Sequence, residues 1–91
     1  MVYLYNMFKN YKKVFDYCRE ADESSNDAEA LMNYSHALTM FKSMGDIHRM
    51  GKCSANIGNI HFKMERYAEA QTHYKEAIKA SESEIAEISV I

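Results

Sequence analysis

A short pattern of residues occurs twice in this chain, 40 positions apart. Each copy places a small, an aromatic and a small residue at i, i+4 and i+7: Ala30, Tyr34 and Ala37, then Ala70, Tyr74 and Ala77. Residues at this spacing lie on one face of a helix. Small side chains let a neighbouring helix come close, and the ring fills the space that remains. A repeat of this length predicts stacked helix pairs, an architecture that usually binds other molecules rather than catalysing reactions.

The composition favours one small helical domain over residues 1–91. The chain has no Pro and only three Gly, the two residues that break helices, so an all-α fold is expected. The net charge of −2 gives no reason to expect nucleic acid as a partner. No apolar run has the length of a membrane span, so no membrane partner is expected. The apolar first residues lack a basic region and a cleavage site, so no signal peptide is expected.

The two cysteines, Cys18 and Cys53, are predicted to be reduced apolar residues of a cytoplasmic protein. They fall at comparable places in successive predicted helices, which leaves a disulfide bridge conceivable.

Helical spacing predicts two repeats and a tail. The first repeat covers about 7–44, the second about 46–81, and a C-terminal capping helix about 82–91. Three breaks separate the helices: a polar segment at 22–26, a turn signal at 44–46 and a short break at 65–66. Expected N-caps are Asn6, then Asn26 or Asp27, then Asp46, while Gly45 suits the left-handed position after a helix end.

The 40-residue shift tests this register. It places Asn6 on Asp46, so two predicted N-caps coincide. At the other end, Ile85 and Ala86 fall where Gly45 and Asp46 stand, and the third turn signal is lost. A fourth helix that runs into the tail without a break therefore remains an alternative to a separate capping helix.

The second repeat closely resembles a tetratricopeptide repeat (TPR) over residues 51–84. Its first helix has a large and then a small residue, Ile57 and Gly58, followed by an aromatic neighbourhood at His61 and Phe62. Its second helix has the family's alanine and aromatic positions at Ala70, Tyr74 and Ala77.

The first repeat, about residues 11–44, matches less fully. Tyr17 and Cys18 stand in for the large and small pair, and both repeats lack the family's proline. The segment 41–46, which reads Phe-Lys-Ser-Met-Gly-Asp, resembles the junction of the long-repeat branch of the family. The resemblance implies two antiparallel helix pairs stacked as a short right-handed solenoid, with the C-terminal helical tail beyond them.

In the TPR family, the first helix of each repeat lines a concave groove that holds a peptide. The resemblance therefore implies a peptide-binding set drawn from both first helices: Asn56, Asn59, Lys52, Lys63, Phe62, Arg19, Lys12 and Phe15. Ala55, Asp16 and Asp22 would face the same groove. Lys52, Lys63 and Arg19 would attract an acidic peptide, while the two aspartates oppose it.

Asn56 and Asn59 are the strongest candidates in this set. An Asn side chain offers both an acceptor and donors, so it can bracket the backbone of an extended peptide. Residues three apart also share one helix face. The alternative is that both are solvated polar residues opposite Ile57 and Ile60.

The residues give little support to an enzyme. The four histidines lie on three predicted helices, and no pair has the i, i+4 spacing of a helical metal site. They are expected to be packing or surface residues, with His61 at an aromatic packing position. No phosphate-binding loop, CxxC motif or serine elbow occurs. We therefore expect no cofactor and no metal, and the remaining metal-dependent alternative predicts that zinc shifts the melting temperature.

Two functions remain for the whole chain. The first is a scaffold that holds a peptide of a partner protein in the groove. The second is structural self-association, with homodimers formed through the exposed faces at the ends of the array, because two repeats are fewer than an isolated array normally needs. Tyr3 and Tyr5 fit either packing on the first helix or such an exposed edge.

Overall fold

Four helices make up the protein. The computed structural model describes residues 2–90, and the side chains of these residues except those of residue 3 and residues 87–90. The helices are α1 (Val2–Glu23), α2 (Asp27–Met44), α3 (Ile47–Lys63) and α4 (Tyr67–Val90). No strand occurs in residues 2–90, so the predicted all-α class is confirmed.

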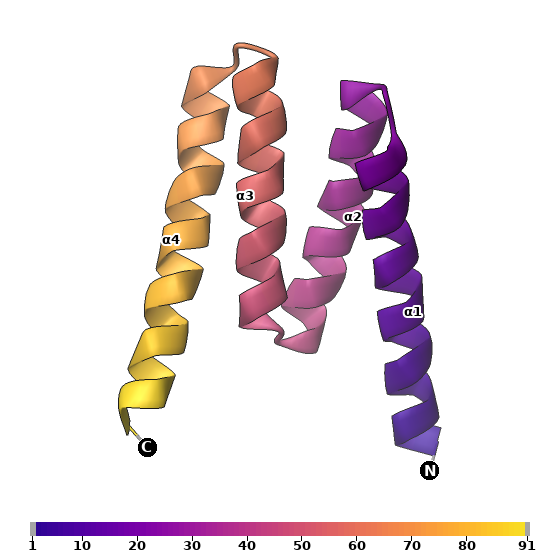
Figure 1. Ribbon diagram of the computed structural model, residues 1–91. Helices are drawn as coiled ribbons and strands as arrows, with labels where there is room; N and C mark the ends of the chain where they lie inside the picture. Colours follow the sequence, from indigo (N-terminus) through magenta and orange to yellow (C-terminus); the bar gives the residue numbers. More distant parts are fainter. Residues whose placement is uncertain (1, 91) are drawn as a thin grey trace.

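Consecutive helices run in opposite directions and each packs against the next one in the chain (Figure 1). The helices α1 and α2 lie side by side, as do α3 and α4. Between these pairs, α2 and α3 meet at the turn that joins them and diverge toward the opposite end, at the top of Figure 1. The Cα atoms of α1 and α3 stay more than 8 Å apart throughout the described chain, so these two helices face each other through side chains.

The 40-residue repeat is visible in the helix boundaries. The first helix of each pair ends at Glu23 and Lys63, and the second begins at Asp27 and Tyr67. Both of these boundaries are 40 positions apart, the same shift as that of the alanines and tyrosines, whereas the starts of α1 and α3 and the ends of α2 and α4 do not repeat at 40.

The predicted turn residues shape the connections. Asn26 is the N-cap of α2, and its side chain accepts a hydrogen bond of 3.0 Å from the Glu29 N–H. Gly45 takes the left-handed conformation after α2, at φ 69°, and Asp46 caps α3. The predicted break at 65–66 is also present, and Glu65 there adopts a φ of 62°. This positive φ stops α3 from continuing and turns the chain into α4.

Two predicted boundaries are wrong. Asn6 is not an N-cap, because α1 begins at Val2 and Asn6 lies inside its second turn. The separate capping helix expected over about 82–91 does not form, because α4 continues to Val90. The segment 81–84 contains no Gly or Pro, and the hydroxyl of Ser83 donates to the Lys79 carbonyl within the helix. The polar segment 22–26 ends α1 where Asn26 caps a following helix, whereas the polar segment 81–84 continues α4.

A continuous core joins α1, α2 and α3. Its largest fully buried apolar side chains are Val14, Phe41 and Ile57, each at most 2% exposed. Tyr34 is 7% exposed, which confirms its predicted core position. The repeat predicts a core position for Tyr74 as well, and this is wrong: Tyr74 is only half-buried, with its ring on Gly58 between α3 and α4.

Two predictions fall on side chains outside this description: the packing or exposed edge at Tyr3, and the apolar face of the predicted capping helix at Ile88, Val90 and Ile91. Tyr5, on the other hand, is described and is 68% exposed on α1. Within residues 2–90, none of the helices combines the length and the apolar character needed to cross a membrane.

Candidate functional site

A groove runs between α1 and α3, with α2 as its floor. It consists of two adjoining hollows of about 280 and 210 Å³, which share Asp22, Tyr34 and Asn56. The upper hollow lies where α2 and α3 diverge, and the lower hollow lies toward the turn between them. The shared residues make the two hollows one continuous surface.

The upper hollow has a polar rim and a small-residue floor. Its floor is made of the buried side chains of Ala21 on α1 and of Ala30 and Tyr34 on α2. The Tyr34 hydroxyl donates a hydrogen bond to the Asp22 carboxylate, which ties α2 to the last turn of α1. This bond fixes the position of one acidic group on the rim.

An ion pair crosses the open end of the groove. The Lys63 ammonium lies 3.1 Å from the Asp27 carboxylate, so the end of α3 is joined to the start of α2. Both residues line the upper hollow. The pair is largely exposed, and exposed pairs contribute little stability, so its main effect is to place one charge of each sign at the mouth.

The two predicted asparagines both line the groove but differ in their bonding. The Asn59 side-chain oxygen accepts a 2.5 Å hydrogen bond from the Tyr74 hydroxyl, which leaves its NH₂ group as the available donor. The Asn56 amide makes no hydrogen bond to any described residue, although it is half-buried and borders both hollows. Asn56 therefore keeps an acceptor and two donors for a ligand.

The lower hollow is lined by aromatic and sulfur-bearing side chains. Phe15 packs against Phe41 with ring centroids 6.4 Å apart, and the Arg49 guanidinium lies 5.5 Å from the Phe15 ring centre. Cys18 and Cys53 also line this hollow and are free thiols, as predicted. Burial raises the pKa of the Cys53 thiol to about 12, and burial also raises the pKa of Cys18. Both thiols are therefore protonated apolar wall residues.

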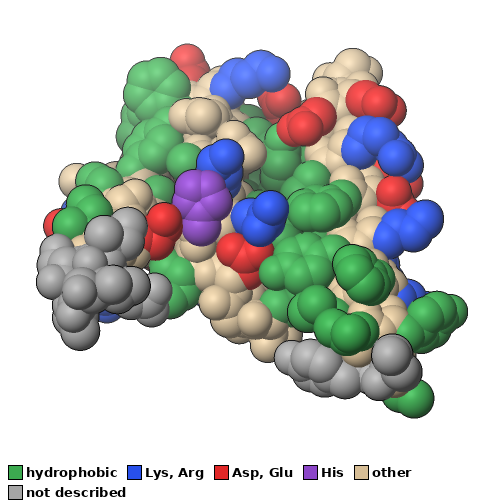
Figure 2. All heavy atoms as spheres, turned by 60° about the horizontal axis from the view of Figure 1, so that its bottom comes forward, with side chains coloured by type: hydrophobic (Ala, Val, Ile, Leu, Met, Phe, Trp, Pro, Cys, Tyr) green, Lys and Arg blue, Asp and Glu red, His purple; other side chains and the backbone are tan. Residues whose placement is uncertain are grey.

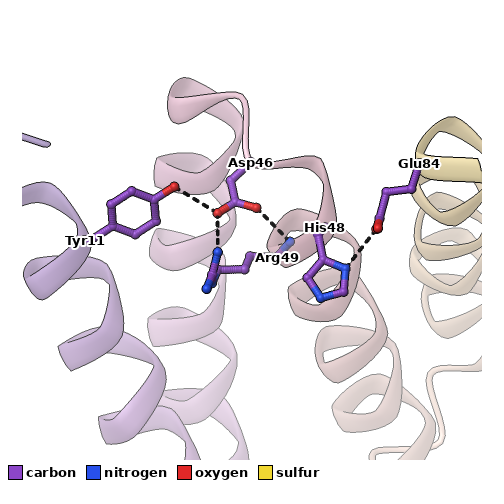
Figure 3. A network of polar contacts seen from close by, with 5 residues as sticks. All are labelled: Tyr11, Asp46, His48, Arg49 and Glu84. Atoms are coloured by element: carbon purple, nitrogen blue, oxygen red, sulfur yellow. Dashed lines mark hydrogen bonds and ion pairs between the residues drawn. The ribbon is translucent and has the colours of Figure 1, made fainter. Parts of the chain in front are cut away.

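A polar network anchors the closed end of the groove (Figure 3). Asp46 accepts hydrogen bonds from the Arg49 backbone N–H at 3.1 Å, from the Arg49 guanidinium at 2.9 Å and from the Tyr11 hydroxyl at 3.0 Å. Beside this cluster, His48 lies 2.9 Å from the Glu84 carboxylate on α4. Tyr11 comes from α1, so the network connects α1 to the first turn of α3.

The network sets the charge state of Asp46. Partial burial would raise the pKa of this carboxyl, but the hydrogen bonds from Arg49 and Tyr11 outweigh it and hold the pKa below its usual value. The same bond raises the pKa of Tyr11, because the phenol donates its proton to a carboxylate. Asp46 is thus ionised while it caps α3.

The structure brings five of the predicted peptide-binding residues to the groove and places three elsewhere. Asn56, Asn59 and Lys63 line the upper hollow, whereas Phe15 and Lys52 line the lower one together with Asn56. Phe62 lies instead on the α4 side of α3, where its ring meets Tyr67 edge-on at 5.3 Å. Lys12 and Arg19 line neither hollow.

The expected attraction for an acidic peptide is largely offset within the chain. Lys12 and Arg19 both pair with Asp16, at 3.3 and 3.2 Å, and Lys63 pairs with Asp27. Of the four predicted basic residues, only Lys52 has no ion pair among the described side chains. The groove itself is bordered by charges of both signs: Asp22, Asp27, Arg49, Lys52 and Lys63.

Sequence reasoning missed two contributors to the groove. Tyr34 was expected only in the core, yet its hydroxyl reaches the rim through Asp22. Arg49 was not singled out, although it lies three positions after the predicted cap Asp46 and lines the lower hollow. Pairs of opposite charge at i, i+3 on a helix were the available signal for Arg49.

Two histidines form a buried contact between α3 and α4, away from the groove. The rings of His61 and His73 stack at 5.4 Å, and the Nδ1 atom of each has no hydrogen-bond partner in the described structure. Burial, followed by the charges of His73 and Arg66, lowers the pKa of His61. His61 thus occupies a packing position, as predicted. Among the described residues, no group of three or more His, Cys, Asp or Glu side chains is arranged to hold a metal ion.

Comparison with protein-family models, with curated proteins and with solved structures gave no match for this chain.

Proposed function

We propose that this chain is a protein-interaction module that holds an extended peptide of a partner protein in the groove between α1 and α3. In this proposal the two helix pairs are TPR-like repeats, stacked so that the first helix of each pair lines the concave side. The 40-residue match of the helix boundaries supports that arrangement. The proposed role is binding rather than catalysis.

The observation that carries the proposal is the position and bonding of Asn56. Its amide lies at the junction of the two hollows and has its full hydrogen-bonding capacity free of described partners. An extended peptide presents a C=O and an N–H at each residue, so one Asn amide can bond both without selecting a side chain. Asn59, held by Tyr74, adds a second donor three residues along the same helix.

The groove also suggests the chemistry of the ligand. Apolar walls at Phe15 and Phe41 favour a peptide with an apolar or aromatic side chain next to its bonded backbone. Since both carboxylates and basic groups border the groove, a peptide of mixed charge fits better than a strongly acidic one.

A library of displayed random peptides provides a test without a known partner. We expect selected peptides to shift the NMR signals of the Asn56 and Asn59 side-chain amides and of residues around the lower hollow. As a control, Asn10→Ala removes an exposed asparagine of α1 outside the groove, and this variant should bind the selected peptides as the wild type does. Selected peptides whose signals map to the far side of α4, with the groove unchanged, would refute this function.

Self-association through the end faces of the array is a second candidate function. One specific observation favours it: large apolar side chains are exposed at both ends, with Phe8 at 68% on α1 and Ile78 at 59% on α4. Figure 2 shows hydrophobic side chains over the first half of α1 and over α4, on either side of a charged band. A dilution series with mass measurement tests it, because a strict monomer at high concentration excludes this role.

A further inference from the structure

One face of α4 carries a regular seam of side chains, all exposed except Tyr74, which is half-buried against Gly58. The seam positions are separated alternately by four and three residues: Tyr67, Gln71, Tyr74, Ile78, Ser81 and Ile85. This is the spacing by which one helix packs along another in a coiled coil. Tyr67, Ile78 and Ile85 are 56, 59 and 64% exposed. Tyr67 and Ile78, together with Tyr74 and with Phe62 of α3, border an apolar hollow of about 420 Å³.

The two ends of the array are not equivalent. The repeat aligns Ile78 with Leu38, which is 8% exposed in the core that α2 shares with α3. The position therefore keeps an apolar residue suited to a covering helix. On α1, by contrast, the residue aligned with buried Cys53 is the exposed Lys13, and the residue aligned with Ile60 is the exposed Glu20. Charges at these positions make α1 a poor surface for the α4 seam of another copy.

We propose that the α4 seam binds the α4 seam of a second copy of this chain, with the two helices antiparallel. The proposal develops the self-association candidate and does not depend on the peptide groove.

The order of residues in the seam supports a two-fold axis. When an antiparallel copy is placed with its axis at Glu76, Tyr74 lies opposite Ile78, Gln71 opposite Ser81, and Tyr67 opposite Ile85. Every aromatic residue then meets an isoleucine, and the two polar residues meet each other. A surface in which i contacts j and j contacts i is what a symmetric dimer requires. In the antiparallel order the positive N-terminal end of each helix dipole also lies beside the negative C-terminal end of the other, which is favourable.

The available area fits a dimer of limited strength. A fully buried aromatic side chain buries roughly 150–250 Å² of surface, so each half-exposed ring can bury about 100 Å² more in an interface. Phe62, Tyr67, Ile78 and Ile85 together with the flanking stems give about 1,000 Å² from both copies, near the lower limit of specific interfaces. The dimer is thus expected to dissociate on dilution.

The symmetric register makes a specific prediction about Lys75. This exposed residue flanks Tyr74 in the seam, so the axis brings Lys75 close to the same residue of the other copy. The like charges weaken the dimer. An equimolar mixture of the wild type and Lys75→Glu should therefore form mixed dimers about two- to fivefold more tightly than either protein alone. A head-to-tail arrangement does not bring the two Lys75 residues together and predicts no such preference.

Sedimentation velocity over a dilution series is the test, with circular dichroism to confirm the helix content of each variant. The wild type should pass from monomer to dimer as its concentration rises. Ile78→Glu should remain monomeric, and the control Phe8→Glu, an exposed apolar residue of α1, should dimerise like the wild type.

Three outcomes would overturn the proposal: a wild type that stays monomeric at the highest concentration, a dimer that survives Ile78→Glu, or a mixture with no preference for mixed dimers. Peptide binding measured on monomeric Ile78→Glu tests the proposed groove independently of the dimer, because Ile78 lines neither the upper nor the lower hollow of the groove.

Discussion

The ring of Tyr74 lies so close to Gly58 that a Cβ atom at position 58 would stand 2.8 Å from two ring carbons. This contact joins α3 to α4 and sets the ring where its hydroxyl reaches Asn59. A glycine in the middle of a helix usually costs about 1 kcal/mol relative to alanine. Here the missing side chain is what lets the helices close around the ring.

Gly58→Ala should therefore destabilise the protein in spite of its better helix propensity. We expect the free energy of unfolding to fall by about 1–3 kcal/mol, because the ring must move and give up its bond to Asn59. Urea denaturation measures the change. In a Tyr74→Leu background the same substitution should be neutral or stabilising, and an equal loss in both backgrounds would show that the ring is not the cause.

The bond from Tyr11 to Asp46 should contribute to stability in a pH-dependent way. Tyr11→Phe is expected to lower the free energy of unfolding near neutral pH, because the hydrogen bond to the Asp46 carboxylate is lost. The folded-state pKa of Asp46 is below the usual value of 3.8, so its contribution is present above 3.8 and disappears as the pH falls through the lower folded value. The difference between variant and wild type should shrink over that range.

Tyr17→Phe is the matched control, since the Tyr17 ring stacks on His36 and its hydroxyl makes no hydrogen bond in the described structure. A loss of stability as large as that of Tyr11→Phe would contradict the role given to the Asp46 network.

His61 should make the protein less stable in mild acid. Its folded-state pKa is lowered from 6.5 by burial and by neighbouring positive charge, so the unfolded chain binds a proton more readily than the folded one. The free energy of unfolding should therefore decrease as the pH falls below 6.5. Thermal melts of the wild type and His61→Phe across this range test the sign, and the variant should lose part of the dependence. Identical pH profiles would contradict the assignment.

Cys53 should resist alkylation while the protein is folded. With a thiol pKa of about 12, the thiolate fraction at about pH 8 is on the order of 10⁻⁴. Iodoacetamide labelling followed by mass spectrometry should show little modification of Cys53 without denaturant and rapid modification in its presence. Fast labelling of the folded chain would mean that the lower hollow is more open than its 3% exposed cysteine indicates.

The sequence predicted most of the helix boundaries but few of the contacts. Gly45 and Asp46 are local signals, because a left-handed residue and a cap act on their own backbone. The predicted N-cap at Asn6 was wrong because a residue suited to a cap does not start a helix when the residues before it are already helical. The predicted break before the C-terminal tail was also wrong, since the polarity of residues 81–84 alone did not end α4.

The groove was predictable only in part. The resemblance implied a groove position for Asn56 and Asn59, and their spacing of three residues put them on one face of the helix; both line the upper hollow. It could not show that Phe62, only three positions after Asn59, turns toward Tyr67 on the other side. Nor could it reveal the bond from Tyr34 to Asp22, which depends on how two helices meet.

The binding constant of a selected peptide for the wild type and for Asn56→Ala is the most direct test of the groove. Asn56 is preferable to Asn59 here, because removing Asn59 would also break the bond from Tyr74. Isothermal titration calorimetry should give a dissociation constant about tenfold weaker for the variant, equal to about 1.4 kcal/mol, with unchanged melting temperature. Equal affinity for both proteins would contradict the proposal that the chain holds peptides between α1 and α3.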